Sequence, residues 1–579
     1  MINRQAYKAI AAVVGDNYIS EEPEIMESYR SGPAGYENGT GYERVMCCLP
    51  HAVCLPKNTK EVLAVVKICN RYQVPYVPYS TGFYGPRTHC HVENELIIDL
   101  KRHNEFDIDE KHFYFNVGSG VTLAALQQEA LNKGAYTVIG GGGAQCSAIC
   151  NLIGDGWSPL SLRIGLPHRR ILGTELVLPD GEFVALGSLA VSDDPFWGEG
   201  PGPDLRGLLR GFTGVRGCLG IVAKMAIKTL PFQPEPLVPS GVAPNTTLMF
   251  PTYPKGHQRE GQATRVAWQN YLVPTKEAQV KAMFEIGHAE IAAACTKVPK
   301  FWRAIAKAED KEEFWKLWLV ETEESLRNFF IVRVLVVGYT SREDFDYQMR
   351  VLNDIMTEVG GKATPTKPSD ESWIKNADSA GMWLMTGSYV SVDYIIETLT
   401  QATQHGLTYA ELKRKYTPPL MPDFGDPGWF QNFELGHQGY SEFLIYWDHR
   451  EDISGVDQFY VDTSKMNIQH RYYTSLIGPH QPMFLTGPQY GPNYHKWFLD
   501  VKNEFDPDWL SHPPVPFAHD AFVERAPWMQ KIKDWNPPKE EEYTKVLSPA
   551  LAKFTYPKVD LSKIPLNGGL EDGGLSKLK

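Results

Sequence analysis

The spacing of apolar residues changes repeatedly between helical and strand periods over the first 230 residues, which predicts a mixture of α-helices and short β-strands. Residues 61–71 (EVLAVVKICNR) have apolar side chains at helical spacing, and residues 74–79 (VPYVPY) are typical of a short strand. Further elements are predicted at 95–100, 114–117, 123–133, 171–178 and 183–186. The chain therefore begins with an α+β unit.

A second pattern follows a proline-rich stretch at 231–254, which predicts a domain boundary near Leu237. Residues 329–339 and 439–448 predict strong strands, and residues 342–359 predict an amphipathic helix. Strands that alternate with helices in this way favour an antiparallel sheet backed by helices. The polar stretch from residue 536 onward predicts an extended arm.

Composition excludes several classes of protein. A chain of 579 residues is long enough for two or more domains with a cleft between them. The net charge is −12 and no basic block occurs, so nucleic acid is not expected as a partner. No window approaches the ~18 apolar residues of a membrane span. Residues 1–16 predict an amphipathic helix rather than a secretory signal.

Nine cysteines without a CxxC pair favour reduced thiols and a cytoplasmic protein. His89 and His91 flank a cysteine, but no further ligands are grouped nearby, so no metal site is expected.

Three glycine-rich segments are candidates for ligand binding, and they lie at 78–85 (PYSTGFYG), 139–144 (IGGGGA) and 211–228. Loops of this kind expose backbone N–H groups that can hold a diphosphate without interference from a Cβ atom. A structural turn is the more common explanation for a segment like the first, which fits neither the Walker nor the GxGxxG pattern. A linker is the alternative for the second segment, and its apolar flanks disfavour that alternative.

The order of these segments resembles the vanillyl-alcohol oxidase and para-cresol methylhydroxylase (PCMH) family of FAD-linked oxidoreductases. The resemblance covers roughly residues 45–232 and, more weakly, residues 329–513. It rests on VVKICN (65–70), STG (80–82), the glycines 140–143, Asn151, GDGWSP (154–159), LVLPDGE (176–182), GPDLRGL (202–208) and LGIVAK (219–224).

The resemblance implies an α+β fold with a two-part PCMH-type FAD-binding domain and an inserted cap, an antiparallel sheet covered by helices. The expected divisions are an N-terminal FAD part (1–236), a substrate-binding cap (237–475), a C-terminal return to the FAD part (476–535) and an arm (536–579). Residues 502–513 (KNEFDPDWLSHP) resemble the returning segment of the family.

The resemblance also implies which residues bind FAD. The strand at 439–448 has Tyr440 and Tyr446 but no histidine, with His437 just outside, so FAD is expected to be non-covalent. The expected cofactor contacts are Tyr79, Ser80, Thr81, Gly82, Phe83, Tyr84, Gly85, Gly141, Gly142, Ser147, Asn151, Gly154, Gly156, Trp157, Gly220, Ile221 and Val222.

The implied catalytic residues are Tyr84, Arg163, Arg471, Tyr472 and Tyr473. Family members that oxidise phenols hold the substrate as a phenolate with tyrosines and an arginine, which eases hydride loss to flavin N5. The tyrosine-arginine dipeptide of the family is replaced here by Tyr472-Tyr473 after Arg471, so the arginine is displaced.

Cations stand where the family usually has an acid near the flavin, and they are Arg163, His168, Arg169 and Arg170. They suit an anionic substrate such as a carboxylate or thioester, or they belong to a solvated loop.

The expected function is FAD-dependent hydride transfer from a para-alkylphenol or benzylic alcohol, by a dehydrogenase or hydroxylase rather than an oxidase. The alternatives are a 2-hydroxy-acid dehydrogenase and a flavin-bearing electron-transfer subunit of a complex. The metal motif of lactate and glycolate dehydrogenase relatives is not found in the sequence. A redox partner protein and a homodimer or larger complex are further expectations.

Overall fold

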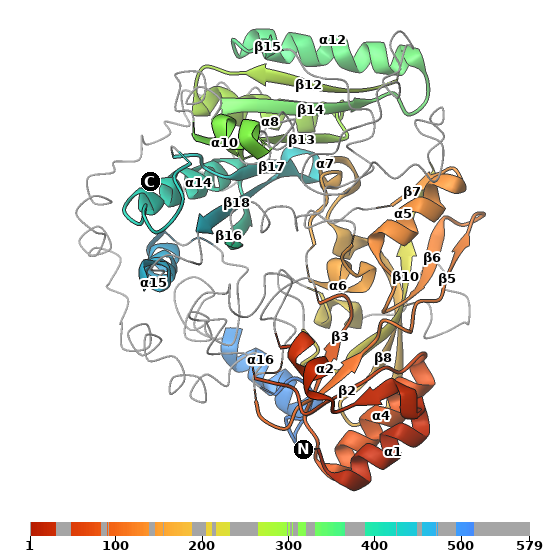
Figure 1. Ribbon diagram of the computed structural model, residues 1–579. Coiled ribbons are helices and arrows are strands. Elements are labelled where there is room, and N and C mark those ends of the chain that lie inside the picture. The colour runs from red at the N-terminus through yellow and green to blue at the C-terminus, as the bar shows by residue number, and fades with distance from the viewer. Residues whose placement is uncertain are drawn as a thin grey trace.

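The protein was analysed as a computed structural model, in which an N-terminal part lies below a cap (Figure 1). The boundaries predicted near residues 237, 476 and 536 fall outside the described residues and stay predictions. The structure describes residues 2–30, 48–82, 90, 92–137, 145–154, 156–187, 204–210, 216–231, 265–297, 299–300, 304, 311–319, 330–364, 388–423, 425–447, 454–470, 472 and 494–513.

The N-terminal part opens with a four-stranded sheet in the order β1-β2-β4-β3, in which β4 pairs in parallel with β2 and β3. Two helices pack against it, and their apolar sides share one core. The predicted helix at 61–71 is confirmed and begins after Asn58, whose side chain accepts from the Glu61 N–H. The elements are α1 (Arg4–Val14), η1 (Asp16–Tyr18), β1 (Ile19–Ser20), α2 (Pro23–Ser28), β2 (Ala52–Cys54), α4 (Thr59–Tyr72), β3 (Tyr76–Tyr79) and β4 (Leu96–Asp99).

A second, antiparallel sheet follows in the order β5-β6-β10-β8-β9. The short strands β7 and β11 pair with each other as a separate two-stranded sheet. Helices α5 and α6 share an apolar core with this sheet. The predicted hairpin at 171–186 is confirmed as β8 and β9. The elements are β5 (Phe106–Asp109), β6 (Tyr114–Gly118), α5 (Leu123–Asn132), β7 (Ala135–Tyr136), α6 (Ala148–Ile153), α7 (Ser161–Ile164), η4 (Pro167–Arg170), β8 (Ile171–Val177), β9 (Phe183–Gly187), η6 (Leu205–Leu208), β10 (Ile221–Lys228) and β11 (Leu230–Pro231).

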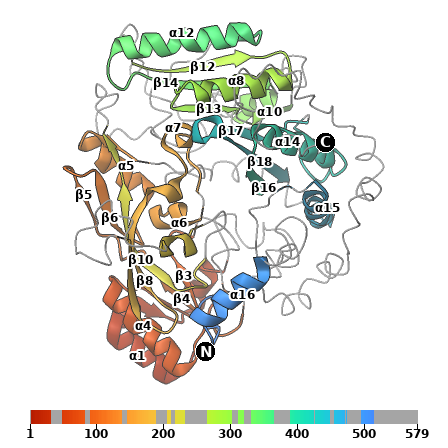
Figure 2. The ribbon, with the colours of Figure 1, turned by 180° about the vertical axis from the view of Figure 1, so that it is seen from behind.

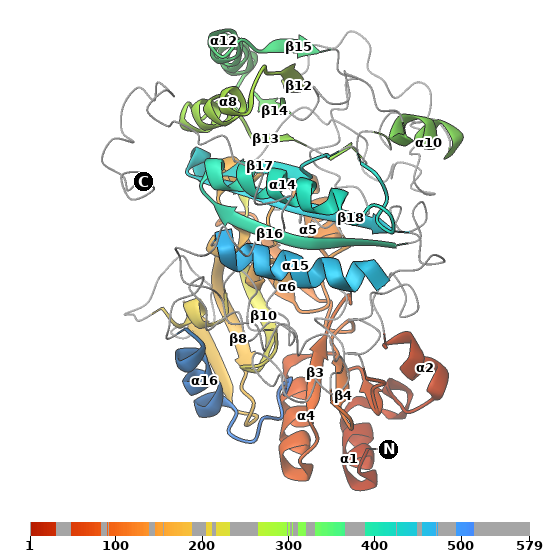
Figure 3. The same cartoon turned by 90° about the vertical axis from the view of Figure 1, so that its left-hand side faces the viewer.

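The cap is built on a seven-stranded antiparallel sheet in the order β15-β12-β14-β13-β17-β18-β16, which confirms the predicted sheet backed by helices. Helices α8, α12 and α14 share a core with one face of the sheet, and Figure 3 shows α14 running along β18. The elements are β12 (Val266–Leu272), α8 (Lys276–His288), β13 (Ala294–Lys297), α10 (Lys311–Leu319), β14 (Ile331–Val337), α12 (Arg342–Glu358), β15 (Lys362–Thr364), β16 (Ser388–Glu397), α14 (Leu399–Arg414), β17 (Trp429–Phe433), η8 (Glu434–Gly436), β18 (Gln438–Trp447) and α15 (Ser454–His470).

The other face of the cap sheet rests on the N-terminal part. Successive side chains of a strand point to opposite faces, so the side chains of β14 contribute to the cores on both faces of the sheet. Its Val332 and Val334 pack with the helices of the cap, whereas Leu335 packs with Tyr136 and Leu160 of the N-terminal part. The segment around α7 therefore lies between the two parts.

Residues 494–513 return to the N-terminal part, where α16 (Tyr494–Phe505) packs against the core of the second sheet and lies near β8 (Figures 2 and 3). Lys502 is fully buried, and its Nζ donates to the carbonyls of Cys218 and Ser511, both at 2.8 Å. Ser511 forms a parallel bridge with Tyr76 of β3. The sheet that contains β3 is thus extended by a segment from the far end of the chain.

No helix among the residues described is long and apolar enough to cross a membrane. The eight described cysteines form no disulfide.

Candidate functional site

The loop after β3 makes a tight turn that only glycine accommodates. Gly82 has φ +64°, and a Cβ atom there would lie 1.7 Å from the Tyr79 hydroxyl oxygen. Ser80 is buried, and its Oγ lies 3.3 Å from the Cys150 Sγ of α6. Thr81 is exposed. The structure therefore brings this loop against α6; Phe83, Tyr84 and Gly85, predicted for the same loop, lie outside the described residues.

A second tight approach lies around α6. The Ser147 Oγ accepts from the Cys150 N–H at the start of the helix, and Gly154 follows its end. A Cβ atom on Gly156 would lie 1.8 Å from the Asn151 Nδ2. The Asn151 Oδ1 is buried and has no hydrogen-bond partner in the described part of the chain. A buried acceptor of this kind is costly unless a ligand donates to it.

The turn before β10 completes the arrangement. Gly220 has φ +112°, and a Cβ atom there would lie 2.3 Å from the Val177 carbonyl oxygen. Gly217 has φ +78° and sits against Pro78 of β3, which a Cβ atom would approach to 2.3 Å. Ile221 and Val222 follow as buried residues. Three segments predicted to bind FAD therefore meet at the end of β3.

These features fit FAD. Glycines allow the chain to pack closely at Gly82, Gly156 and Gly220, and the Asn151 Oδ1 offers an acceptor that has no partner among the described residues. Gly141 and Gly142, predicted for the same cofactor, lie outside the described residues. The assignment of single residues to the cofactor stays a prediction.

An aromatic wall joins the predicted flavin segment to the cap. Trp157 is 6% exposed and lies 4.7 Å from Tyr440, 5.3 Å from Trp429 and 6.3 Å from Phe433, measured between ring centroids. The Gln431 side chain, between Trp429 and Phe433, donates to the carbonyls of Ser158 and Pro159 at 3.2 and 2.9 Å. The cap strands are thereby fixed against the segment that follows α6.

The wall ends in a polar pair. The Tyr440 hydroxyl donates to Glu442 Oε2 at 2.9 Å. Both residues belong to β18 and are two positions apart, so their side chains lie on the same face of the strand, the face that contacts Trp157. Glu442 is 8% exposed. The wall therefore combines apolar ring faces with one buried carboxylate, a combination that suits a flat substrate with a hydroxyl group.

Tyr472 lies elsewhere in the cap, in a buried cluster on α14. Its hydroxyl is 3.0 Å from the Thr408 Oγ1, and its ring contacts His405 and His470 at 5.1 and 5.3 Å. Burial lowers the pKa of His405 to about 3, with a further contribution from His470, and burial lowers the pKa of His470 to about 4. Both rings are neutral at neutral pH.

The two clusters lie on opposite faces of β18. The Ser441 Oγ is 3.0 Å from the His405 Nδ1 on α14, whereas its neighbour Tyr440 contacts Trp157. The structure thus places Tyr472 with the α14 side rather than with the aromatic wall. Arg471 and Tyr473 lie outside the described residues. The catalytic role predicted for Tyr472 stays a prediction.

Arg163 does not contact the aromatic wall in the described contacts. It is exposed at the end of α7, where its guanidinium lies 4.3 Å from the Tyr339 ring centroid and donates to the Glu290 carbonyl at 3.5 Å. It lines a cavity of about 280 Å³ at the junction of the two parts. The lining residues are Tyr136, Arg163, Ile164, Arg169, Arg170, Lys228 and Leu230.

The sequence singled out Arg163, Arg169 and Arg170, but not the cavity they form. Lys228 was missed because one lysine at the end of a strand carries no local signal. The aromatic wall was missed apart from Trp157 and Tyr440, because its members meet only through strand pairing. His168, predicted with the arginines, does not line the cavity.

Comparison with known proteins bears on the whole arrangement. Residues 50–187 match the family described as FAD binding domain. The glycolate oxidase subunit GlcD of Bacillus subtilis is 29% identical over 189 residues, which are 32% of this chain and 38% of the relative. The match therefore spans well under half the length of that relative.

Solved structures match over most of the chain. A structure of p-cresol methylhydroxylase with bound substrate has a TM-score of 0.68 at 16% identity, covering 88% of this chain and 96% of the other. The 4-ethylphenol oxidase of Gulosibacter chungangensis, in complex with isoeugenol, has a TM-score of 0.64 at 15% identity, covering 89% and 97%. These matches confirm the predicted fold class. Residues 50–187 therefore belong to a PCMH-type FAD-binding domain, and the chain has the fold of the vanillyl-alcohol oxidase and p-cresol methylhydroxylase flavoproteins.

Proposed function

We propose that this chain is an FAD-dependent oxidoreductase that removes a hydride from a carbon attached to an aromatic ring, as in para-alkylphenols or benzylic alcohols. The observation that carries this proposal is the aromatic wall of Trp157, Trp429, Phe433 and Tyr440, which links the predicted flavin segment to the cap. The fold shared with p-cresol methylhydroxylase and 4-ethylphenol oxidase supports it.

FAD, when bound, supplies the two-electron acceptor that receives the hydride. The Asn151 Oδ1, which has no partner among the described residues, would contact it beside the close turns at Gly82, Gly156 and Gly220. An Asn151→Leu variant should bind FAD at least tenfold more weakly, because the acceptor is lost. Flavin fluorescence during titration of the apoprotein measures this without any substrate.

The wall orients the substrate ring and the polar pair handles its proton. Contacts between aromatic rings contribute about 0.5–1.5 kcal/mol beyond burial, enough to favour a flat ring in one plane. Oxidation of a benzylic alcohol releases a hydride from carbon and a proton from the hydroxyl group. Glu442, which already accepts from Tyr440, is the proposed acceptor of that proton.

The direct test is anaerobic mixing of the FAD-loaded protein with 4-ethylphenol, a benzylic alcohol, glycolate and D-lactate, followed by flavin absorbance. Bleaching by the aromatic compounds is expected. Tyr440→Phe should slow bleaching at least tenfold, whereas Tyr271→Phe, which loses a hydroxyl contact to Asn353 in the cap far along the sheet, should not. Equal effects of the two variants would remove Tyr440 from the site.

Oxidation of a 2-hydroxy acid is the second candidate, and the match to the glycolate oxidase subunit favours it. Bleaching by glycolate or D-lactate, with none by the aromatic compounds, would replace the first proposal with this one. A flavin that no compound in the panel bleaches would instead favour an electron-transfer subunit. That relative is by name a subunit, so a partner protein as electron acceptor is part of both proposals.

Tyr472 is tested separately, because its contacts support packing in the cap rather than contact with substrate. Tyr472→Phe should leave the rate of flavin reduction within a factor of two and lower the free energy of unfolding by about 1 kcal/mol, since one buried hydroxyl contact is lost. A more than tenfold slower reduction at unchanged stability would return it to the substrate site.

A further inference from the structure

Among the described residues, the cavity at the junction of the two parts is lined by four cations and by no acid. Arg163, Arg169, Arg170 and Lys228 supply four positive charges, and the remaining lining residues are uncharged. Glu434, which lies outside the lining, pairs with Arg169 at 2.9 Å and also accepts from the Leu166 N–H. This one carboxylate therefore pairs with Arg169 and interacts by charge with Arg170.

Arg170 is the buried member of this group. It is 6% exposed, and its Nη2 donates to the Ile164 carbonyl. Its Nε is buried without a hydrogen-bond partner among the described residues. A guanidinium does not lose its proton in proteins, so this N–H stays charged and unused. The cost of burying it falls if an anion completes its hydrogen bonds.

Lys228, the last residue of β10, lies close enough to Arg170 for the two positive charges to interact. Burial and, next, the charge of Arg170 lower the pKa of Lys228. Two cations that repel one another inside a cavity form an arrangement that a bound anion relieves. Arg163 and Arg169 are exposed at the mouth.

We propose that this cavity binds a small oxyanion with two negative charges, held by Arg170 and Lys228 at the floor and by Arg163 and Arg169 at the mouth. A guanidinium presents paired N–H donors that match a phosphate or carboxylate group. The volume of about 280 Å³ lies just below the usual range of ligand pockets, which limits the ligand to a small molecule.

The site is separate from the predicted cofactor contacts. Val222 and Lys228 stand near opposite ends of β10, and six residues of a strand span about 20 Å. The lining residues all belong to the N-terminal part, and Arg163 also contacts Tyr339 and Glu290 of the cap, so an anion that binds Arg163 would act on a residue that touches the cap. The ligand would stiffen this junction, which goes beyond the proposed oxidation reaction.

The test is calorimetric titration of the FAD-loaded protein with inorganic phosphate and, separately, with glutarate, in a buffer of low ionic strength. We expect saturable binding at one site per chain. Lys228→Met should weaken binding at least tenfold. The matched control Lys224→Met, on the same strand but outside the lining, should leave binding within a factor of two.

Arg170→Met can disturb the backbone through the lost contact with Ile164, so Arg163→Gln at the exposed mouth is the second variant, with an expected loss of about threefold. Binding of phosphate alone assigns a phosphate group, and binding of glutarate alone assigns a dicarboxylate. Absence of saturable binding with both, or equal losses in Lys224→Met and Lys228→Met, overturns the proposal. Because the titration needs no turnover, its result is independent of the substrate tests above.

Discussion

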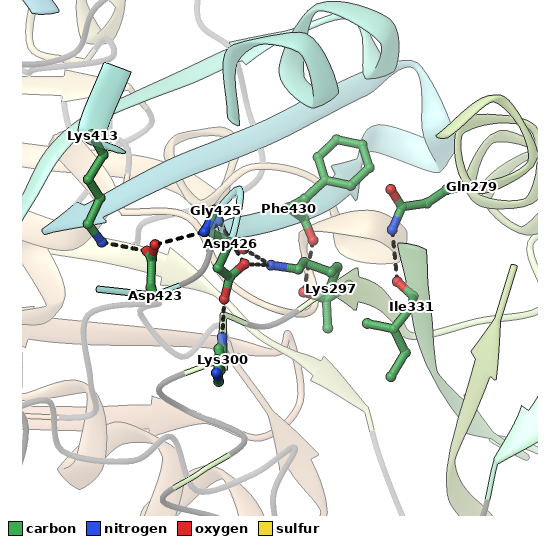
Figure 4. Close-up of polar contacts among 11 residues, drawn as sticks. Gln279, Lys297, Lys300, Ile331, Lys413, Asp423, Gly425, Asp426 and Phe430 are labelled. Atoms are coloured by element: carbon green, nitrogen blue, oxygen red, sulfur yellow. Dashed lines mark hydrogen bonds and ion pairs between the residues drawn. The ribbon is translucent and has the colours of Figure 1, made fainter. Parts of the chain in front are cut away.

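The cap and the junction cavity both bury cations, but they differ in what neutralises the charge. In the cap, Lys297 and Lys413 are each 1% exposed. Lys297 pairs with Asp426 and Lys413 pairs with Asp423 (Figure 4). At the junction, the buried Arg170 donates to the Ile164 carbonyl and feels the charge of Glu434, but it forms no ion pair with an acid among the described residues.

The carboxylates of the cap are also fully used. Asp426 accepts from the Gly428 N–H at 3.1 Å and from the Lys300 N–H, and Asp423 accepts from the Gly425 N–H at 3.2 Å. Every charge in this network has partners from the protein itself, which indicates a structural role. The contrast teaches that an uncompensated buried cation is the better guide to a ligand site than a buried cation as such.

The largest effect is expected where a compensated pair is broken. Asp426→Asn leaves the buried ammonium of Lys297 without its counter-charge, and the free energy of unfolding should fall by about 3–5 kcal/mol. Denaturant unfolding measures it. The double variant with Lys297→Met should recover most of the loss, and a loss under about 1 kcal/mol in the single variant would contradict the structural role.

His405 shows a third way to bury a basic group, which is to stay neutral. Its folded-state pKa of about 3 lies below the ordinary value of 6.5, so its stabilising effect is complete above pH 6.5 and is lost as the pH falls toward 3. By pH 4.5 the loss is about 2–3 kcal/mol.

His405→Asn should therefore flatten the decline of the unfolding free energy between pH 6.5 and 4.5. The exposed His288→Asn is the control and should not. If both variants decline as steeply as the unmodified protein, His405 is not the titrating group.

A smaller effect is expected where the cation has no acid. Arg170→Met removes a charge that is costly to bury along with one contact to a carbonyl, so the unfolding free energy should change by less than about 1 kcal/mol. Phosphate at ten times its Kd should stabilise the unmodified protein by about 1.4 kcal/mol and the variant not at all. Thermal unfolding with and without phosphate measures both the stability change of the variant and the stabilisation by phosphate. If Arg170→Met loses as much stability as Asp426→Asn, the proposed difference between the junction and the cap is wrong.

The smallest effect sets the scale for exposed charges. Arg342 and Asp346 pair at 2.9 Å on α12 with side chains that are 44% and 53% exposed. Asp346→Asn should leave the denaturation midpoint unchanged within error, because water screens an exposed pair. A measurable shift of the midpoint would show that burial does not decide whether an ion pair contributes to stability.

Local patterns predicted the elements well. The helix at 61–71 is found at Thr59–Tyr72, and the strand at 439–448 is found at Gln438–Trp447. Apolar spacing sets these elements, and their ends shift by a residue or two because a cap such as Asn58 stands outside the apolar pattern.

The faces of the elements could not be predicted. Nine of the ten residues of β18 are buried, so no alternation of polar and apolar positions shows that Tyr440 meets Trp157 while Ser441 meets His405. The partner of Lys297 could not be predicted from local sequence, because Asp426 lies 129 residues away, and Lys228 likewise lies far along the sequence from Arg170. Glycine-rich segments could be recognised in the sequence because a glycine's backbone requirement is local, and their assignment to FAD stays a prediction.

The return of residues 494–513 to β3 has a consequence for synthesis of the chain. The Gln73 side chain donates to Asp508, 435 residues away, and Ser511 pairs with Tyr76. On the ribosome, the sheet edge at β3 must wait until the whole cap has been translated, because its last neighbour emerges after the cap. In the nascent chain, the edge of β3 therefore lacks its last neighbour for as long as the cap is being translated.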